Sequence, residues 1–136
     1  MHYDKIASFL ESHHLLSLAT AGDELWCASA FYAFDRESVI FVFASDGETR
    51  HMRNIAKNST VAGVVAFESK IIANIKGVQF SGAVVEATKS DERLYLERFS
   101  YAKVLNPTLY KIVINELKMT DNTLGFSKKL SWKREF

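Results

Sequence analysis

The hydrophobic pattern of the chain predicts a protein built mainly from short strands. Apolar and β-branched residues gather in six runs, separated by turn-forming residues such as Gly22-Asp23 and Asp35–Ser38. The predicted strands span residues 15–21, 24–34, 39–44, 60–67, 75–88 and 109–117. Because most connections between these runs are of hairpin length, the pattern favours antiparallel pairing over a parallel α/β sheet.

Apolar residues at helical spacing predict two or three short helices between the strands. The first is expected to follow Asp4 as its N-cap. The second follows the third strand, where Ser45 and Glu48 fit a capping box that places the helix start at Asp46. A third helix is expected after Ser90. These helices are too few and too short to form a layer, so we expect them at the periphery of the strands.

Together these elements favour one fold, a mainly β protein with a six-stranded antiparallel split β-barrel and peripheral helices. At 136 residues the chain forms a single domain spanning 1–136, small enough to gain stability from dimerisation. Gly77 and Gly82 fall inside the fifth strand and predict bends or bulges, which a closed barrel needs at its corners. The ten Phe, five Tyr and two Trp can fill such a barrel, form a dimer interface or stack on a planar ligand.

Composition and charge exclude several classes of function. A formal net charge of +1 provides no field that would draw polyanions, so we expect no nucleic-acid and no membrane-surface partner. No apolar run approaches the length of a membrane span, and the first residues do not resemble a secretory leader. The single cysteine, Cys27, excludes an internal disulfide. We therefore expect a cytoplasmic protein.

The C-terminal segment, residues 121–136, is locally basic and carries Phe126, Trp132 and Phe136. Interleaved basic and aromatic residues can bind nucleic acid. Since the whole chain is close to neutral, we expect this tail to pack on a partner subunit instead.

The sequence contains little catalytic apparatus of its own. It has no Walker loop, no G-x-G-x-x-G, no nucleophile elbow and no H-E-x-x-H motif. Cys27 lies in an apolar strand, which predicts a buried and unreactive thiol. The four histidines and Cys27 have no spacing typical of a metal site. If the protein is an enzyme, a cofactor must therefore supply the chemistry.

The turn after the third strand has the composition of an anion-binding site. Thr49, Arg50 and His51 place a hydroxyl, a guanidinium and an imidazole at the start of a helix, where free N–H groups and the helix dipole favour negative charge. The dipole disfavours a cation in the first turn, so Arg50 indicates an anionic partner. That partner is either a bound anion or a nearby carboxylate, Asp46 or Glu48.

Two other features are compatible with a flat ligand. Ala28, Ser29 and Ala30 leave little side-chain bulk in the middle of the second strand, which fits either a ring lying against the strand or tight barrel packing. Gln79, in the fifth strand, offers donors and an acceptor to a heteroaromatic edge, or else faces solvent.

Three segments resemble a known family. SLATAGDELWCASAFYAF, VIFVFASDGETRHMRNIAKNSTVAGVV and IKGVQFSGAVVEA, in this order, resemble the pyridoxamine phosphate oxidase-related split barrels that bind flavin mononucleotide (FMN). ELWCASAFY, ETRHM, KGVQFSG and TDNTLGFSKK resemble phrases of an uncharacterised bacterial subgroup, the YhbP-like proteins, nearly word for word. The likeness extends over almost the full chain.

The resemblance implies a homodimeric six-stranded split barrel with one FMN at each end of the interface. The residues that it assigns to the flavin site are Ala28, Ser29, Ala30 and Phe31 beside the isoalloxazine ring, Phe43, Ala44 and Ser45 in the continuing wall, Thr49, Arg50 and His51 at the phosphate, and Gln79 near the ring. It assigns no catalytic residue and no metal.

Three positions depart from the family pattern. His51 lies where lysine or arginine is common, which makes the charge at the phosphate depend on pH. Tyr32 lies where the true oxidases have a lysine, and Cys27 aligns with their arginine. The segment with which those oxidases bind substrate also has no recognisable counterpart. These departures argue against oxidation of vitamin B6.

Three functional hypotheses follow. The first is an FMN-binding flavoprotein, in its enzymatic form a flavin-dependent oxidoreductase whose small-molecule substrate the sequence does not identify. The second is a split-barrel protein that binds haem or another planar ligand, with His13, His14 or His51 as an axial ligand. The third is a dimeric scaffold without a cofactor.

Overall fold

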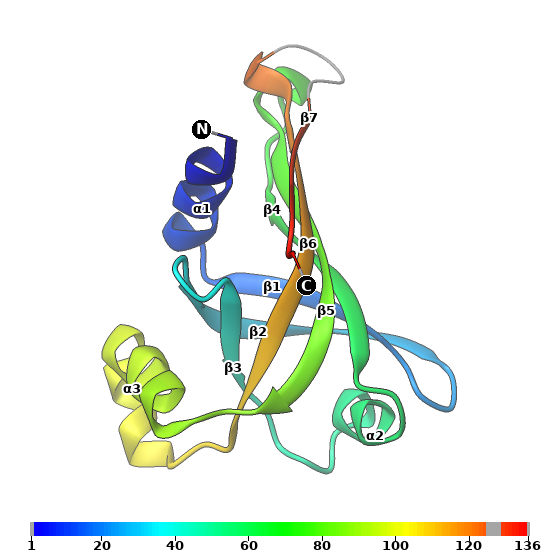
Figure 1. Cartoon of the computed structure of the whole chain (residues 1–136), viewed down its shortest axis with the longest axis vertical. Helices are drawn as coiled ribbons and strands as arrows, with labels where there is room; N and C mark the ends of the chain where they lie inside the picture. The colour runs from blue at the N-terminus through cyan, green and yellow to red at the C-terminus, as the bar shows by residue number, and fades with distance from the viewer. Residues whose placement is uncertain (1, 125–128, 136) are drawn as a thin grey trace.

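The fold is that of a β-barrel with helices at its edges (Figure 1). The structure, a computed structural model, describes residues 2–124 and 129–135. In chain order the elements are α1 (His2–Ser12), β1 (Leu15–Ala21), β2 (Leu25–Asp35), β3 (Ile40–Ala44), α2 (Arg50–Lys57), β4 (Thr60–Phe67), β5 (Lys76–Glu86), α3 (Lys89–Arg98), β6 (Leu109–Asp121) and β7 (Lys129–Lys133). Short 3-10 helices occupy η1 (Ile72–Asn74), η2 (Ser100–Leu105) and η3 (Asn122–Leu124).

Six of the strands close into an antiparallel barrel, which confirms the predicted fold class. The ring runs β3-β2-β1-β4-β5-β6 and closes where β3 pairs with β6. One edge of β6 is shared, because residues 109–113 pair with β3 and residues 116–120 pair with β7. The barrel is therefore split along β6, and its upper half carries β7 instead of β3 (Figure 1).

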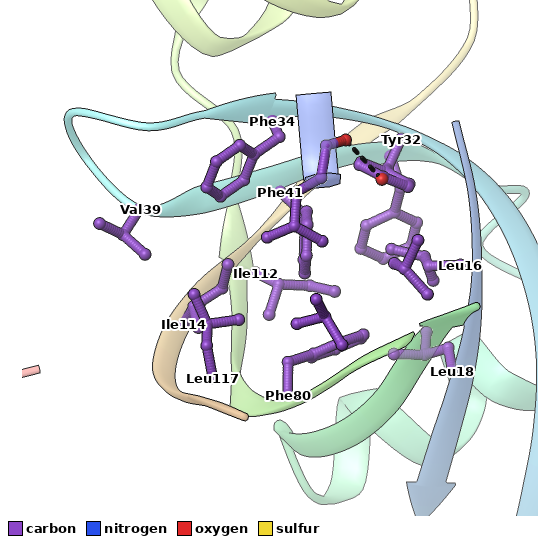
Figure 2. Packing of buried hydrophobic residues seen from close by; sticks show 14 of the residues in the cluster. Leu16, Leu18, Tyr32, Phe34, Val39, Phe41, Phe80, Ile112, Ile114 and Leu117 are labelled. Carbon is purple, nitrogen blue, oxygen red and sulfur yellow. Dashed lines mark hydrogen bonds between the residues drawn. The ribbon is translucent and has the colours of Figure 1, made fainter. Parts of the chain in front are cut away.

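The interior of the barrel is filled by large side chains from every strand of the ring (Figure 2). Tyr32, Phe41 and Ile112 are fully buried. The ring centroid of Phe41 lies 4.9 Å from that of Tyr32 and 4.9 Å from that of Phe80, in both cases edge to face. Aromatic residues thus fill the barrel, and this core holds the strands that carry the candidate site.

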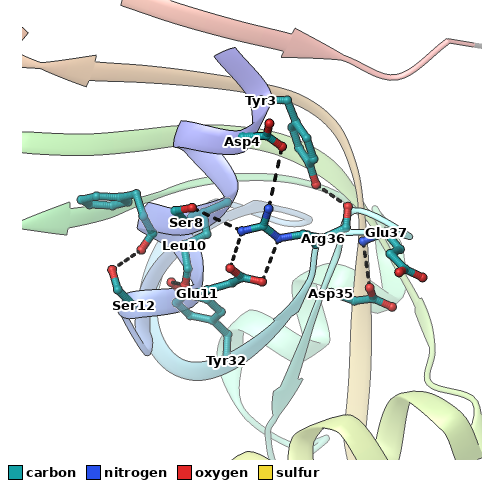
Figure 3. A network of polar contacts seen from close by, with 11 residues as sticks. Tyr3, Asp4, Ser8, Leu10, Glu11, Ser12, Tyr32, Asp35, Arg36 and Glu37 are labelled. Atoms are coloured by element: carbon teal, nitrogen blue, oxygen red, sulfur yellow. Dashed lines mark hydrogen bonds and ion pairs between the residues drawn. The ribbon is translucent and has the colours of Figure 1, made fainter. Parts of the chain in front are cut away.

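Helix α1 is fixed to the barrel at both of its ends. Near its C-terminal end, the Tyr32 hydroxyl donates a 2.6 Å hydrogen bond to the Leu10 carbonyl (Figure 2). Along its exposed side, Arg36 in the β2–β3 turn forms a two-point contact with Glu11, with N···O distances of 3.0 and 2.5 Å (Figure 3). Tyr3 donates to the Arg36 carbonyl at 2.5 Å, and burial raises the pKa of this phenol to about 12.

The helix starts differ from the predicted ones. Helix α2 begins at Arg50 with Thr49 as its N-cap, four residues later than the predicted start. The N-cap of α3 is Thr88, which shares a capping box with Asp91, and Ser90 lies inside the helix. Helix α1 already includes His2, so Asp4 lies in its first turn and is not its cap. In α2 and α3 a competing Ser or Thr lay within a few residues, and local pattern did not separate the two candidates.

Strands β1 and β4 have the predicted bounds, and those of β2, β3 and β5 differ from the prediction by one or two residues. The pairing of β5 with β6 shifts register between Ser81 and Gly82, which confirms the bulge at Gly82, whereas Gly77 pairs regularly with Thr120. Strand β6 runs to Asp121, beyond the predicted end.

Part of the C-terminal tail forms a strand, β7, in the sheet of the same chain. Strand β7 pairs with β6 of the same chain, and the Trp132 ring lies 5.7 Å from that of Tyr3. The described part of the tail therefore packs on this chain, and its packing on a partner subunit stays a prediction. Phe126 and Phe136 lie outside the described residues. Among the described helices, none has the length and apolar composition needed to cross a membrane.

Candidate functional site

Two of the predicted phosphate-site residues, Thr49 and His51, meet the predicted wall residue Ser45 where β3 ends and α2 begins. The Ser45 hydroxyl lies 2.7 Å from Nε2 of His51, and the Thr49 hydroxyl lies 3.2 Å from the same nitrogen. The two hydroxyls are 3.4 Å apart. Ser45 is held by its N–H, which donates to the Thr108 carbonyl at 3.1 Å. We call Ser45, Thr49 and His51 the hydroxyl–imidazole cluster.

Backbone donors at the start of α2 complement this cluster. The Thr49 hydroxyl accepts from the Met52 N–H at 3.3 Å and so caps the helix. The N–H groups of Arg50 and His51 have no hydrogen-bond partner among the described residues. Unpaired N–H groups at the positive end of a helix, beside two hydroxyls and an imidazole, fit a phosphate group in both charge and hydrogen bonding.

The imidazole of His51 is set up to be neutral when no anion is present. Burial disfavours its charged form and lowers its pKa from the ordinary 6.5. Nε2 can then accept a hydrogen bond from the Ser45 hydroxyl. The Thr49 hydroxyl is 3.0 Å from the Asp46 carbonyl and donates to it. A bound dianion would favour the charged imidazole, so anion binding at the cluster would be coupled to proton uptake by His51.

Arg50 turns away from the cluster and toward the β1–β2 hairpin. Its guanidinium donates to the Glu24 carboxylate at 2.6 Å and lies 4.0 Å above the Trp26 ring centroid. The carboxylate partner that the sequence left open is therefore Glu24, 26 residues upstream, and neither Asp46 nor Glu48. Asp46 instead accepts from the Glu48 N–H and closes its own turn.

A buried asparagine, which the sequence reading missed, locks α2 to the same hairpin. The Asn54 amide donates to the Thr20 hydroxyl at 3.0 Å and to the Glu24 carbonyl at 2.9 Å, and it accepts from the Asp23 N–H at 3.2 Å. The sequence does contain a signal for this role, because Asn54 is a polar residue beside the apolar stripe of its helix. Asn54 thereby fixes the position of the hydroxyl–imidazole cluster relative to β2.

The small residues of β2 divide between two faces of the sheet. Ala28 and Ala30 pair with Leu18 and Leu16, which are buried, so they face the barrel interior. Cys27, Ser29 and Phe31 lie on the outer face, where the thiol of Cys27 is exposed and Phe31 is 44% exposed. The prediction of a buried thiol is wrong, because the N-terminal half of β2 is covered on its inner face only.

Gln79 lies on the same outer face but far from β2. In register, Ser29 lies opposite Ser17, Ser17 opposite Val64, and Val64 opposite Gln79. Three strand spacings of about 4.8 Å separate Gln79 from Ser29 by roughly 14 Å. Within one chain, Gln79 is therefore too distant to share a ring-sized ligand with Ser29.

The remaining predicted wall residues contribute mainly backbone. Phe43 is fully buried in the core, with its ring centroid 5.8 Å from that of Tyr110, and Ala44 is half-buried. The structure thus brings Ser45, Thr49 and His51 together and places Arg50, Phe43 and Gln79 outside that cluster. In the described part of the chain, no group of His, Cys, Asp or Glu side chains could hold a metal ion.

The fold is a split β-barrel with the hydroxyl–imidazole cluster at the end of its third strand. The family model of pyridoxamine 5'-phosphate oxidase matches residues 3–120, so the chain belongs to the pyridoxamine 5'-phosphate oxidase family. Within it, the chain is 41% identical over 135 residues to the UPF0306 protein YhbP of Salmonella arizonae, covering 96% of this chain and 92% of that protein. The resemblance found in the sequence is confirmed.

Solved structures show the same fold at low sequence identity. A haem-binding protein from Mycobacterium smegmatis superposes with a TM-score of 0.82 at 13% identity, covering 98% of this chain and 58% of that chain. A FAD-binding protein from Mesorhizobium loti superposes with a TM-score of 0.70 at 14% identity, covering 85% of this chain and 91% of that chain. Both comparisons show that the fold of this chain is shared with these proteins.

Proposed function

We propose that this protein is a homodimeric flavoprotein that binds FMN, with the phosphate at the hydroxyl–imidazole cluster. The observation that carries the proposal is the convergence of the Ser45 and Thr49 hydroxyls, the His51 imidazole and the unpaired N–H groups of Arg50 and His51. A phosphate monoester dianion matches that set of donors.

The outer face of β2 supports a flat ring attached to that phosphate. Ser29 and Cys27 are small and exposed there, and Phe31 adds an exposed aromatic surface. Membership of the oxidase family supports FMN as the ring, and a flavin would supply electron-transfer chemistry that the chain itself lacks. The chain's own residues would bind the flavin, orient it and exclude water, as in an oxidoreductase of small molecules.

A second copy of the chain completes this site. The outer face exposes large apolar side chains, with Leu15 at 49%, Phe31 at 44% and Leu25 at 82% exposure, and such a face marks an interface. Gln79 is too far from β2 of its own chain to reach a flavin there. Across a two-fold interface, Gln79 of the partner subunit can approach the ring, as isologous contacts place each residue opposite another part of the same patch.

The tyrosine at position 32 indicates that the substrate differs from vitamin B6. The oxidases' lysine is replaced by a residue whose side chain is fully buried and whose hydroxyl is hydrogen-bonded to Leu10. Tyr32 therefore cannot contact a ligand on the outer face. In the proposed oxidoreductase, no lysine at position 32 would therefore contact the substrate, in contrast to the true oxidases.

The visible spectrum of the purified protein tests the proposal directly. Flavin bands, or a flavin-like spectrum and a higher melting temperature after adding FMN, are the expected result. We expect His51→Ala to weaken FMN binding by about 2 kcal/mol, roughly 30-fold, and Ser45→Ala by about 1 kcal/mol. Arg53→Ala, on the same helix and exposed, is the matched control.

Two outcomes would contradict the proposal. A protein that stays colourless and shows no melting shift with FMN does not bind flavin. A Soret band in place of flavin bands would support the alternative of a haem-binding barrel, for which structural relatives provide a precedent.

A further inference from the structure

A second pocket, distinct from the flavin site, lies under helix α1. Its volume is about 390 Å³, within the range of small-ligand sites. It opens between α1, the end of β4, the start of β5 and the end of β6, and α1 and α2 lie on opposite sides of the barrel in Figure 1. None of the residues assigned to the flavin site lines it.

The walls of this pocket are mainly apolar and aromatic. Phe9 from α1 and Met119 from β6 are buried, and Phe67 at the end of β4 is partly exposed. The His13 ring stacks on Phe9 with centroids 4.1 Å apart, and its centroid lies 6.3 Å from that of Phe67 at a steep angle. These rings form a surface on which a flat apolar group can stack.

The His13 tautomer leaves a hydrogen-bond acceptor at this wall. Nδ1 lies 2.8 Å from the Phe9 carbonyl, and since a carbonyl only accepts, Nδ1 carries the hydrogen. In the neutral ring Nε2 is then unprotonated. No partner for Nε2 is found among the described residues.

Two cations line the same pocket without an ion-pair partner. Lys5 from α1 and Lys76 from β5 form no salt bridge within residues 2–124 and 129–135. The one carboxylate in the lining, Asp121, is 2% exposed and already accepts from the N–H and hydroxyl of Thr123. The lining therefore keeps a net positive charge, carried by lysines that are free to bind an anion.

From the stacked rings and the two lysines without a described salt bridge, we infer that the pocket binds a small aromatic carboxylate, held at the lysines and away from Nε2 of His13. The ring would lie among Phe9, Phe67 and Met119, and the carboxylate would pair with Lys5 and Lys76. Hydrophobic burial supplies most of the affinity, and the lysines select an anion over a neutral or cationic analogue. The inference does not depend on FMN binding.

The probe for this site is 2-naphthoate, compared with the neutral 2-naphthamide and the cationic 2-naphthylmethylammonium. Isothermal titration with the full chain should show 2-naphthoate binding more tightly than the amide and little binding of the cation. We expect the double variant Lys5→Gln/Lys76→Gln to weaken 2-naphthoate binding at least about tenfold, and Phe67→Ser to do the same. Lys118→Gln, an exposed lysine elsewhere on β6, should leave it unchanged.

Four results would overturn the inference. The first three are equal binding of the cation, undiminished binding by the lysine double variant, and no binding by a wild-type protein that melts cooperatively. Competition between 2-naphthoate and FMN would also overturn it, because it would show that the probe occupies the flavin site. Melting curves of the variants confirm that they fold, and Lys5 and Lys76 lie where glutamine is tolerated, since neither forms a described salt bridge.

Discussion

At the scale of single residues, Tyr32 joins the core of the barrel to the end of helix α1. Its ring is fully buried against Phe41, and its hydroxyl donates to the Leu10 carbonyl at 2.6 Å. Burial raises the pKa of this phenol, so the hydroxyl keeps its proton at any physiological pH. The sequence shows the aromatic position but not the carbonyl 22 residues away that receives the bond.

The variant Tyr32→Phe isolates that hydrogen bond. It keeps the packed ring and leaves the Leu10 carbonyl without its donor, so we expect the free energy of unfolding to fall by about 1 to 2 kcal/mol. Urea denaturation measures the change, and the m-value should stay constant. An unchanged midpoint would show that water satisfies the carbonyl and that the bond does not anchor α1.

His51 makes the stability of the fold depend on pH. Because the folded protein lowers its pKa from 6.5, the unfolded chain binds a proton more readily than the folded one. The stability that His51 contributes is therefore fully present above pH 6.5 and is lost as pH falls through the lowered pKa. Melting temperatures of wild type and His51→Gln between about pH 7.5 and pH 5 test this.

The wild type should lose more stability on acidification than His51→Gln. The exposed His2 provides the control, since His2→Gln should leave the pH profile as in the wild type. Parallel profiles for wild type and His51→Gln would show that the imidazole titrates alike in the folded and unfolded states.

Arg50 and Glu24 form an ion pair that competes with any anion at the cluster. Both side chains are substantially exposed, at 42% and 68%, so their pairing is worth at most about 1 kcal/mol. Glu24→Gln releases the guanidinium, and we expect FMN binding to tighten about threefold to fivefold. Fluorescence of Trp26, over which Arg50 lies at 4.0 Å, reports the movement. Unchanged affinity with altered fluorescence would show that Arg50 does not reach the phosphate.

At the scale of elements, the position of α2 depends on a few polar contacts with the β1–β2 hairpin. The buried Asn54 side chain bonds to Thr20, Asp23 and Glu24. Asn54→Ala leaves those groups without partners in a closed interface. We expect the free energy of unfolding to fall by about 2 kcal/mol, whereas Arg53→Ala on the exposed side of the same helix should change it little. Equal effects of the two variants in urea denaturation would contradict this role for Asn54.

The strands were predictable because burial of one face imposes a two-residue period. The runs at 15–21 and 60–67 match β1 and β4 residue for residue, and the glycine at 82 marked a true bulge. Helix starts were less predictable, since Ser45 and Thr49 are both good caps, and in the structure it is Thr49 that accepts from the Met52 N–H and caps α2.

The candidate site was predictable only in part, because sequence pattern shows contacts between neighbouring residues but not contacts between distant segments. Thr49 and His51 are close in sequence, so the local helix start brings them together with Ser45. The partner of Arg50 lies on a hairpin 26 residues away, and no local pattern identifies it. Likewise, alternation along β2 reveals two faces but not which one the barrel covers, so Cys27 was assigned to the wrong side.

At the scale of the whole molecule, the open outer face of the sheet is the surface on which we propose that two chains meet. Strands β1, β2, β4 and β5 present small side chains there, including Ala62, which lies opposite Ala19 and Ser81. Small residues allow two sheets to approach closely, and the exposed Leu25 and Phe31 flank them with apolar area. The proposed dimer would bury this face and enclose the flavin between two copies.

A charge in the middle of this face should dissociate the proposed dimer into monomers and abolish FMN binding at the same time. Ala62→Arg places a guanidinium where the proposed interface is dry, and burying it without a partner costs several kcal/mol. We expect sedimentation to show a dimer for the wild type and a monomer for Ala62→Arg, with FMN binding lost in parallel because Gln79 of the partner subunit is then absent. Ala73→Arg in η1, also exposed but off the sheet, should stay dimeric and bind FMN. A monomeric Ala62→Arg that keeps full FMN affinity would confine the flavin to one chain, and a dimeric Ala62→Arg would place the interface on another surface.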